Sequence, residues 1–238
     1  MRAAVAHTLT LRAAVSLELV SPPSVPYPPV AGTGAFDLKR ASGQETIQDP
    51  LGTETLVFQP ERIFDRRPPA LATGLPHGRP WIRADYHEKL NGPFMAQFLV
   101  RLEQHDPGLL LSEVAWGARD AAPLGRSTIG GVQTNGYLVH VGVADAAAAA
   151  SGPRAQGFVA TAGYVQRLLG GIRATLVIRL WVDQSHRVVA LRTSTIGSNG
   201  GTTLMTLKSF GIRVRLSPPA DRETVDLAAV IGKDIDHD

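Results

Sequence analysis

The chain of 238 residues contains no cysteine, which excludes several kinds of chemistry at once. Without thiols there is no disulfide bond, no thiolate metal ligand and no cysteine nucleophile. Long apolar runs are also missing, because the longest is far shorter than the roughly 18 residues that a membrane-spanning helix needs. The sequence has neither a Gly-x-Ser-x-Gly elbow nor a His-Glu-x-x-His box, so two common hydrolase signatures are excluded as well.

The basic residues are scattered and form no stripe. The net charge is +3, and most of the basic residues are Arg, placed singly among apolar neighbours as at Arg83, Arg179 and Arg192. Nucleic-acid-binding proteins concentrate such charge and interleave it with aromatic residues, so we predict no nucleic-acid partner. The weak positive field fits either a mild attraction to an anionic membrane surface or the Arg usage of a GC-rich genome.

Candidate ligands for a metal ion are equally scattered. The seven histidines show no ligand spacing, and the sequences His87-Glu88 and 234–238 offer only weak sites for a hard cation. We therefore predict no metal site and no cofactor. An acid/base pair such as Asp183 with Glu54 is a possible arrangement that the sequence leaves open. The glycines at 32–34 and at 197 fit hairpin turns better than phosphate-binding loops, since neither group opens a helix.

Alternation of apolar and polar residues is the strongest positive signal. It is clearest from Leu9 through Ala13 to Leu19 and is typical of a strand with one buried face. Short Gly, Pro or Asn turns separate the strands and favour antiparallel pairing. We predict strands at 9–20, 32–40, 45–49, 54–59, 62–65, 80–85, 115–120, 126–129, 135–143, 174–183, 188–196, 202–210 and 213–216.

Four regions change to a helical period. We predict helices within 93–114, interrupted at Asp106-Pro107, and at 145–150, 156–169 and 226–230. Asp106 followed by Pro107 is a good N-cap and first-turn pair. Packed on one face of the sheet, these helices give a two-layer α+β fold, and the composition supports one domain over residues 1–238. The proline-rich segment 21–29 is either a surface hairpin connection or a ligand for a partner.

The inward residues of the predicted strands and helices line either a close-packed core or an apolar cavity. The pattern alone favours the core. The cavity would suit acyl chains, and its predicted lining is Val15, Leu17, Leu19, Phe36, Leu38, Leu56, Phe58, Trp81, Phe94, Phe98, Leu102, Val139, Val141, Leu176, Ile178 and Leu180.

Several segments together resemble the actinobacterial envelope lipoproteins of the LppX/LprG type, which share the LolA-like half-barrel. The resemblance covers nearly the whole chain and rests on strand ends and turns. These are Arg2-Ala3-Ala4, Gly32-Thr33-Gly34-Ala35-Phe36-Asp37, Pro80-Trp81-Ile82-Arg83, Leu180-Trp181-Val182-Asp183 with its hairpin partner at 188–192, and Phe210-Gly211-Ile212 leading through Pro218-Pro219-Ala220 to Val225-Asp226-Leu227.

The resemblance implies a strongly curved antiparallel sheet, a half-barrel, with short helices on its concave face. It also implies a non-catalytic protein that carries a lipid or lipoglycan in the cell envelope, close to a membrane, and we expect a monomer. The family's export signal and lipidated cysteine are missing here, and the Ala-rich opening leads straight into the first predicted strand. We therefore expect the leader to lie upstream of Met1. A sensor or scaffold that docks a protein through its sheet edge and proline-rich loop, and a hydrolase, are the alternatives.

Overall fold

The computed structural model describes residues 1–20, 30–72, 75, 78–86, 93–169, 171, 173–194 and 202–234. Within these residues the strands form one 12-stranded sheet in the order β12-β6-β5-β4-β3-β2-β1-β11-β10-β9-β8-β7. The strands are β1 (Arg12–Val20), β2 (Val30–Asp37), β3 (Ser42–Asp49), β4 (Gly52–Gln59), β5 (Arg62–Arg66), β6 (Trp81–Asp85), β7 (Ala118–Ile129), β8 (Val132–Gly142), β9 (Thr175–Asp183), β10 (Val188–Ser194), β11 (Thr202–Lys208) and β12 (Thr224–Asp226).

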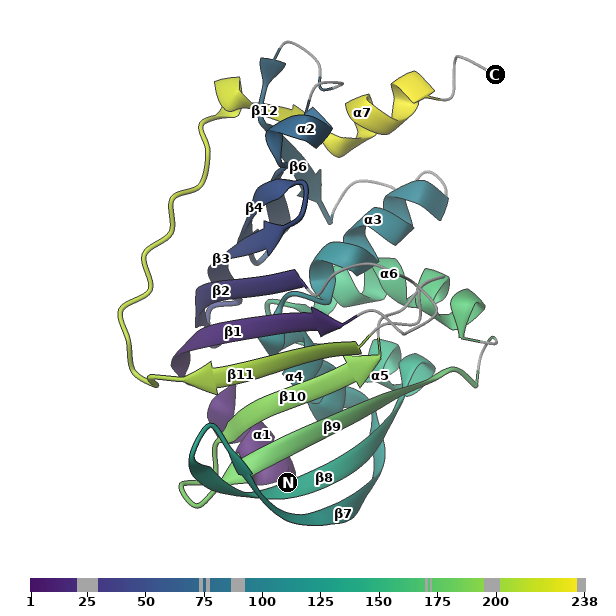
Figure 1. The fold of residues 1–238 in the computed structure, drawn as a ribbon. Coiled ribbons are helices and arrows are strands. Elements are labelled where there is room, and N and C mark those ends of the chain that lie inside the picture. The colour runs from purple at the N-terminus through teal and green to yellow at the C-terminus, as the bar shows by residue number, and fades with distance from the viewer. Residues whose placement is uncertain are drawn as a thin grey trace.

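Seven helices accompany this sheet within the described residues. They are α1 (Arg2–Thr8), α2 (Pro69–Ala72), α3 (Pro93–Glu103), α4 (Pro107–Gly117), α5 (Val143–Ala149), α6 (Ala155–Leu168) and α7 (Leu227–Asp234), with a short 3-10 turn η2 (Asp221–Glu223). Figure 1 shows that α1, α3, α4, α5 and α6 lie on the inner side of the sheet, which bends around α1, α4 and α5 with α3 and α6 beside them. The predicted fold class, a strongly curved antiparallel sheet with short helices on its concave face, is confirmed.

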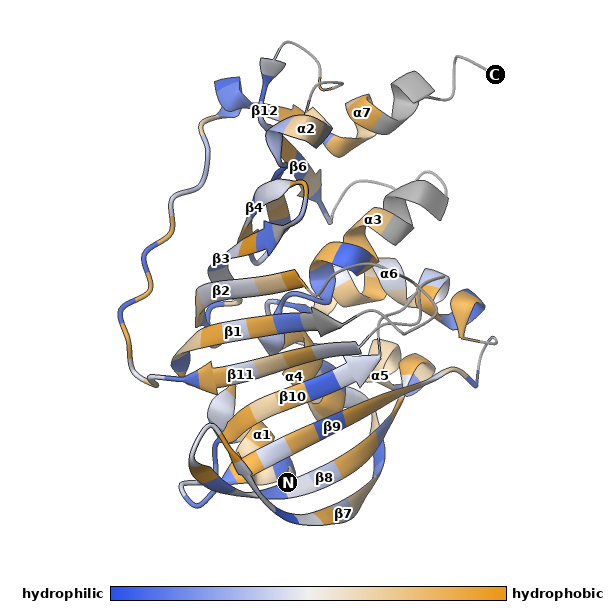
Figure 2. Cartoon of the chain, viewed as in Figure 1, coloured by the Kyte–Doolittle hydropathy of each residue, from blue (hydrophilic) through white to orange (hydrophobic). Residues whose placement is uncertain are grey.

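Strand β1 shows how the sequence pattern becomes a buried face. It lies between β2 and β11, and Val15 faces Gly34 on one side and Leu207 on the other. Ala13, Val15 and Leu17 are buried, whereas Glu18 is exposed. Successive side chains of a strand point to opposite faces, so the period-two pattern places one set against the helices and the other in solvent. Figure 2 shows the same alternation of apolar and polar bands along the central strands.

The first predicted strand begins too early in the sequence. Residues 2–8 form helix α1, and the strand starts at Arg12 instead of Leu9. The alanines favour a helix, and burial of Ala4 and Val5 in the core holds it in place. The hydroxyl of Thr8 accepts a hydrogen bond from the backbone N–H of Val188 at 2.8 Å, which ties the end of α1 to β10. Leu9 and Leu11, which continue the alternating pattern in the sequence, therefore belong to the turn between α1 and β1.

Two further predictions are wrong near the edges of the sheet. The strands predicted at 115–120 and 126–129 are one strand, β7, preceded by the last turn of α4. Pro123 lies in β7 because this is an edge strand, and the register shifts between Pro123 and Gly125. The predicted strand at 213–216 lies in an extended connection from β11 to η2 that joins no ladder (Figure 1).

Some elements were not predicted, and some predictions cannot be compared. Strand β12 pairs in parallel with β6, a long-range contact that no local pattern reveals. The proline-rich segment 21–29, the glycine turn at 197–201, His87-Glu88 and the end of the acidic tail after Asp234 lie outside the described residues.

Gly43 of β3 makes room for an aromatic pair. Phe36 and Phe58 occupy the neighbouring strands at the same register, and their ring centroids are 5.5 Å apart. A Cβ at Gly43 would overlap the ring of the fully buried Phe36. We expect Gly43→Ala to lower the free energy of unfolding by about 1–3 kcal/mol, because overpacking displaces that ring.

The matched control for this prediction is Gly163→Ala on the exposed side of α6, where a Cβ would meet only the end of Arg167. It should raise the free energy of unfolding by up to about 1 kcal/mol, because alanine is the better helix former. Urea denaturation measures both variants. Equal effects of the two substitutions would contradict this account of β3.

Candidate functional site

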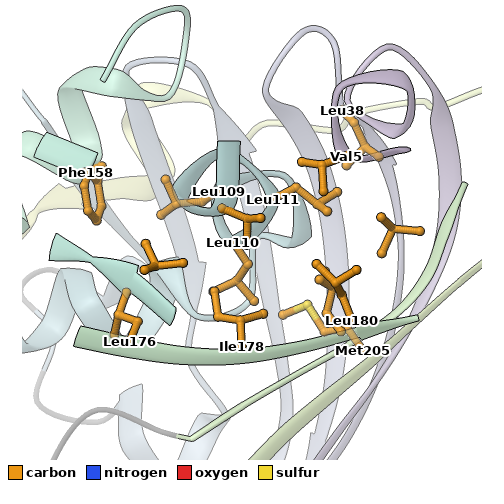
Figure 3. Close-up of a cluster of buried hydrophobic side chains, with 14 of the residues drawn as sticks. Val5, Leu38, Leu109, Leu110, Leu111, Phe158, Leu176, Ile178, Leu180 and Met205 are labelled. Carbon is orange, nitrogen blue, oxygen red and sulfur yellow. The ribbon is translucent and has the colours of Figure 1, made fainter. Parts of the chain in front are cut away.

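The concave face gathers most of the side chains predicted to line a cavity. Figure 3 shows Leu109, Leu110 and Leu111 of α4 above Leu176, Ile178 and Leu180 of β9. All belong to one buried apolar cluster. Twelve of the predicted lining residues are in this cluster, each at most 6% exposed: Val15, Leu17, Phe36, Leu38, Leu56, Phe58, Leu102, Val139, Val141, Leu176, Ile178 and Leu180.

The four remaining residues are placed differently. Phe98 of α3 is half-buried and packs against the main cluster and against a smaller one around Leu99 and Val225. Trp81 is half-exposed and alternates with the buried residues Ile82 and Ala84, so it lies on the outer face of β6. The side chains of Leu19 and Phe94 lie outside the described residues.

Sheet and helices meet closely in the described part of the chain. A cavity of about 20 Å³ lies between α3, α4, α6 and the strands β9 and β10, and a second of about 10 Å³ lies beside Tyr86 and Arg154. Ligand pockets are commonly about 300–1,000 Å³, and about 20 Å³ holds roughly one water molecule. Among the described residues the concave face is thus a packed apolar core, and a hydrocarbon chain placed between them would need the layers to separate.

A row of buried polar residues crosses this apolar region at the junction of α3 and α4. Glu103, Gln104, His105 and Asp106 are each at most 8% exposed, and Glu113 is 7% exposed. Charged side chains are seldom buried unless they are paired. The N-cap at Asp106 could be predicted from the sequence, but the burial of the rest of this row could not, because polar residues at the end of a helix are also typical of a solvent-exposed turn.

Three members of the row line the larger cavity and have unpaired atoms. Oε1 of Glu103, Nε2 of Gln104 and Oε2 of Glu113 are buried without a hydrogen-bond partner. Burial raises the pKa of Glu113 to about 8, and the nearby Asp106 adds to this shift. Burial also raises the pKa of Glu103 well above its ordinary value, although its other oxygen accepts a 2.8 Å hydrogen bond from Thr161. Both side chains are therefore held largely as neutral acids near pH 7.

Asp106 and Arg154 form a buried ion pair that joins α4 to α6. Nε of Arg154 donates to Oδ2 of Asp106 at 2.8 Å, and Nη1 donates to the carbonyl oxygen of Leu38 at 2.6 Å. Asp106 also caps α4 by accepting from the backbone N–H of Gly108 at 2.8 Å. A Cβ at Gly108 would overlap the guanidinium, so glycine is needed for this approach.

A second charged group lies where α3 meets β4 and β5. Nη2 of Arg101 donates to Oε1 of Glu54 at 2.9 Å and to Oδ2 of Asp65 at 3.1 Å, while Nε of Arg67 donates to Oδ2 of Asp65 at 2.8 Å. Burial raises the pKa of Asp65 to about 7 against the opposing effect of Arg101. Burial would also raise the pKa of Glu54, but Arg101 outweighs it and lowers that pKa. Of these two acids, Asp65 is therefore the one that takes up a proton near neutral pH.

Glu45 of β3 is buried beneath β2 and contacts His105. Nδ1 of His105 and Oε2 of Glu45 are 3.1 Å apart, and both side chains are at most 7% exposed. A Cβ at Gly32 or Gly34 would press on Glu45. The hairpin turn predicted at these glycines is wrong, because Gly32 and Gly34 lie within strand β2. They make space there for the Glu45 side chain, a role that their spacing alone does not reveal.

The described residues bring together no metal site and do not unite the suggested acid/base pair. No group of three or more His, Asp or Glu side chains in the described ranges could hold a metal ion. Asp183 of β9 binds Arg187 at 2.7 Å, whereas Glu54 of β4 binds Arg101 of α3. Strands β4 and β9 are six places apart in the sheet. Among the helices described, none has the length and apolarity to cross a membrane.

Comparison with known proteins finds neither a matching protein-family model nor a matching curated protein. Solved structures do match. The lipoprotein LppX of Mycobacterium tuberculosis is 11% identical with a TM-score of 0.48, over 91% of this chain and 97% of that one. LprF of Mycobacterium bovis is 14% identical with a TM-score of 0.45, over 92% and 96%. A LolA superfamily protein of Nitrosomonas europaea is 8% identical with a TM-score of 0.35, over 91% and 94%. The resemblance noted in the sequence is thus found again among solved structures, at identities that leave the ligand to be argued from this chain's own residues.

Proposed function

We propose that this protein is a non-catalytic carrier that binds the acyl chains of a lipid or lipoglycan between its curved sheet and its helices. The continuous apolar cluster on the concave face supports the proposal, because it would offer one hydrophobic surface from β4 to β9 once the layers part. Burial of acyl chains would provide about 25 cal/mol per Å² of apolar surface without specific polar contacts.

The observation that carries the proposal is the imperfect packing between α3, α4, α6 and β10. Three buried polar atoms without partners surround the cavity there, on Glu103, Gln104 and Glu113. Each such atom costs about 1–3 kcal/mol relative to a hydrogen-bonded one. Parting the layers at this place returns these atoms to water, so opening costs less here than along the apolar contact of α4 with β9. The packed structure is then the empty carrier.

Trp116 provides a direct test of lipid entry. It is partly buried on α4 against Phe158 of α6, with ring centroids 5.6 Å apart, whereas the half-exposed Trp181 and Trp81 alternate with the buried residues of β9 and β6 and lie on the outer face of the sheet. A phospholipid with brominated acyl chains should quench Trp116 and leave Trp181 and Trp81 largely unaffected. Quenching should therefore disappear in Trp116→Phe and persist in Trp181→Phe, measured by fluorescence titration.

A second measurement looks for the natural ligand. Native mass spectrometry after gentle purification, followed by organic extraction, should release a lipid in stoichiometric amount. A protein that carries no lipid, and in which brominated lipid quenches none of the three tryptophans, would refute the carrier proposal.

The alternative is an envelope sensor or scaffold that docks a protein partner at its sheet edge. One observation favours it: β7 is an edge strand whose residues are mostly exposed from Arg119 to Arg126. An exposed edge can accept a strand from another chain. A lipid-free protein that retained a partner through β7 would support this alternative.

The proposed location is the cell envelope, outside the cytoplasm and at a membrane surface. It follows from the proposed ligand, since acyl lipids are drawn from and returned to membranes. Genomic sequence upstream of Met1 that encodes a leader ending in cysteine would support it. A location of the native protein in the cytoplasm, measured by cell fractionation, would contradict it.

A further inference from the structure

A groove on the outer side of the sheet has no role in the proposed lipid carriage. Its volume is about 530 Å³, and its walls include Thr53 and Thr55 of β4, Arg66 and Arg67 at the end of β5, Pro69 of α2 and Pro80 before β6. Thr55 and Arg66 face each other across β4 and β5, and they alternate with the buried residues Leu56 and Asp65. They therefore project from the face opposite the apolar cluster.

The groove is large enough for a small organic ligand. Its volume falls within the range of about 300–1,000 Å³ that is usual for ligand sites, and it exceeds the cavities of about 20 and 10 Å³ on the concave side. Pro69 and Pro80 give it stiff apolar walls. Such walls suit the uncharged part of a ligand whose charged group lies on Arg66.

The described lining is basic and contains no carboxylate. Arg66, Thr53 and Thr55 line the groove from the outer face of the sheet, and the hydroxyl of Thr53 donates to Gln48 at 3.1 Å. The guanidinium of Arg67 lies instead over the ring of Phe98, 5.1 Å from its centroid. Arg67 is bound to Asp65 at 2.8 Å. Arg66 is exposed and lies over the ring of Trp81, 6.0 Å from its centroid, with no carboxylate partner among the described residues. The guanidinium of Arg66 thus keeps its donors available for a ligand.

Counted over the described residues, the charged groups at and behind the groove include one more arginine than acids. Arg66, Arg67 and Arg101 are grouped there with two acids, Glu54 and Asp65. Burial raises the pKa of Asp65 to about 7, so this acid is only partly ionised near neutral pH. Guanidinium groups bind phosphate oxygens through paired hydrogen bonds, and threonine hydroxyls complete such sites.

We propose that this groove binds an anionic phosphate group carried by a small organic body. The same chemistry occurs in a soluble phosphate ester and in the head group of a phospholipid. The proposal does not depend on acyl-chain binding at the concave face, and either can fail alone.

The test measures binding of the full-length protein to defined phosphates. Isothermal titration at low ionic strength uses inorganic phosphate and glycerol 3-phosphate, and vesicle flotation compares phosphatidylglycerol with phosphatidylcholine. Arg66→Gln should weaken binding at least about tenfold, because it removes charged hydrogen bonds. Arg179→Gln, which replaces an exposed arginine on β9, should leave phosphate binding unchanged. Thr55→Val removes a hydroxyl from the same wall and should also weaken binding, so it replaces Arg66→Gln if that variant does not fold.

The results separate the two sources of phosphate. If glycerol 3-phosphate binds and this binding is lost in Arg66→Gln, a soluble phosphate ester is sufficient to occupy the groove. If the protein floats with phosphatidylglycerol vesicles but binds no soluble phosphate, and this flotation is lost in Arg66→Gln, the ligand is a lipid head group. Absence of binding to all three phosphate probes, or equal losses in Arg66→Gln and Arg179→Gln, overturns the proposal.

Discussion

Arg154→Met is expected to lower the free energy of unfolding by about 3–5 kcal/mol, because it leaves a buried carboxylate without its partner. The Arg154 side chain is 6% exposed, and its guanidinium is bound to Asp106 at 2.8 Å and to the carbonyl of Leu38 at 2.6 Å. Its loss releases three segments from one another: the start of α4, the start of α6 and the end of β2. Urea denaturation at neutral pH measures the change.

Two further variants test the reason for this loss. Arg119→Met removes a similar pair with Asp145, at 2.7 Å, in which both side chains are about half exposed. This change should cost at most about 1 kcal/mol, because water screens exposed pairs. Asp106→Asn combined with Arg154→Met removes the stranded charge but keeps the helix cap, and should recover part of the stability. Equal losses in Arg154→Met and Arg119→Met would show that burial does not determine the strength of the pair.

The second large effect is a loss of stability as the pH rises. Burial raises the pKa of Glu113 to about 8 and that of Asp65 to about 7, above the values of the same groups in the unfolded chain. The folded protein therefore holds protons that the unfolded chain releases. Their stabilisation is complete below about pH 4 and is lost as the pH rises towards 7 and 8. Each group lowers the free energy of unfolding by about 1.4 kcal/mol per pH unit within this window.

Glu113→Gln should remove one of these contributions. The amide resembles the neutral acid in shape and cannot ionise, so the variant should match the wild type near pH 5 and exceed it by a few kcal/mol near pH 8. Denaturation series from pH 5 to pH 8 measure this difference, and Glu18→Gln controls for the loss of an acidic side chain from the surface of β1. A constant difference between Glu113→Gln and the wild type across the range would show that Glu113 does not titrate with folding.

The successful predictions share a physical basis. Alternation in β1 and in β9 reports which side chains point inward, since strand geometry fixes this locally for each residue. The helical period at 93–114 and the N-cap at Asp106 are likewise local, so the break between α3 and α4 was placed correctly. The errors fell where a distant contact decides the outcome, as in α1, which is held by core packing, and in β12, which pairs with β6 more than 130 residues away.

By itself the sequence determined the class of fold and the apolar character of the concave face, because both depend on periodicities that any strand or helix must obey. Only the tertiary structure decided how closely sheet and helices pack, and it placed a polar row across the apolar face. Arg154 meets Asp106 across 48 residues and Leu38 across 116 residues, and no local pattern records such a pairing. Packing and buried charge depend on which side chains meet in space, so they appear only once the chain has folded.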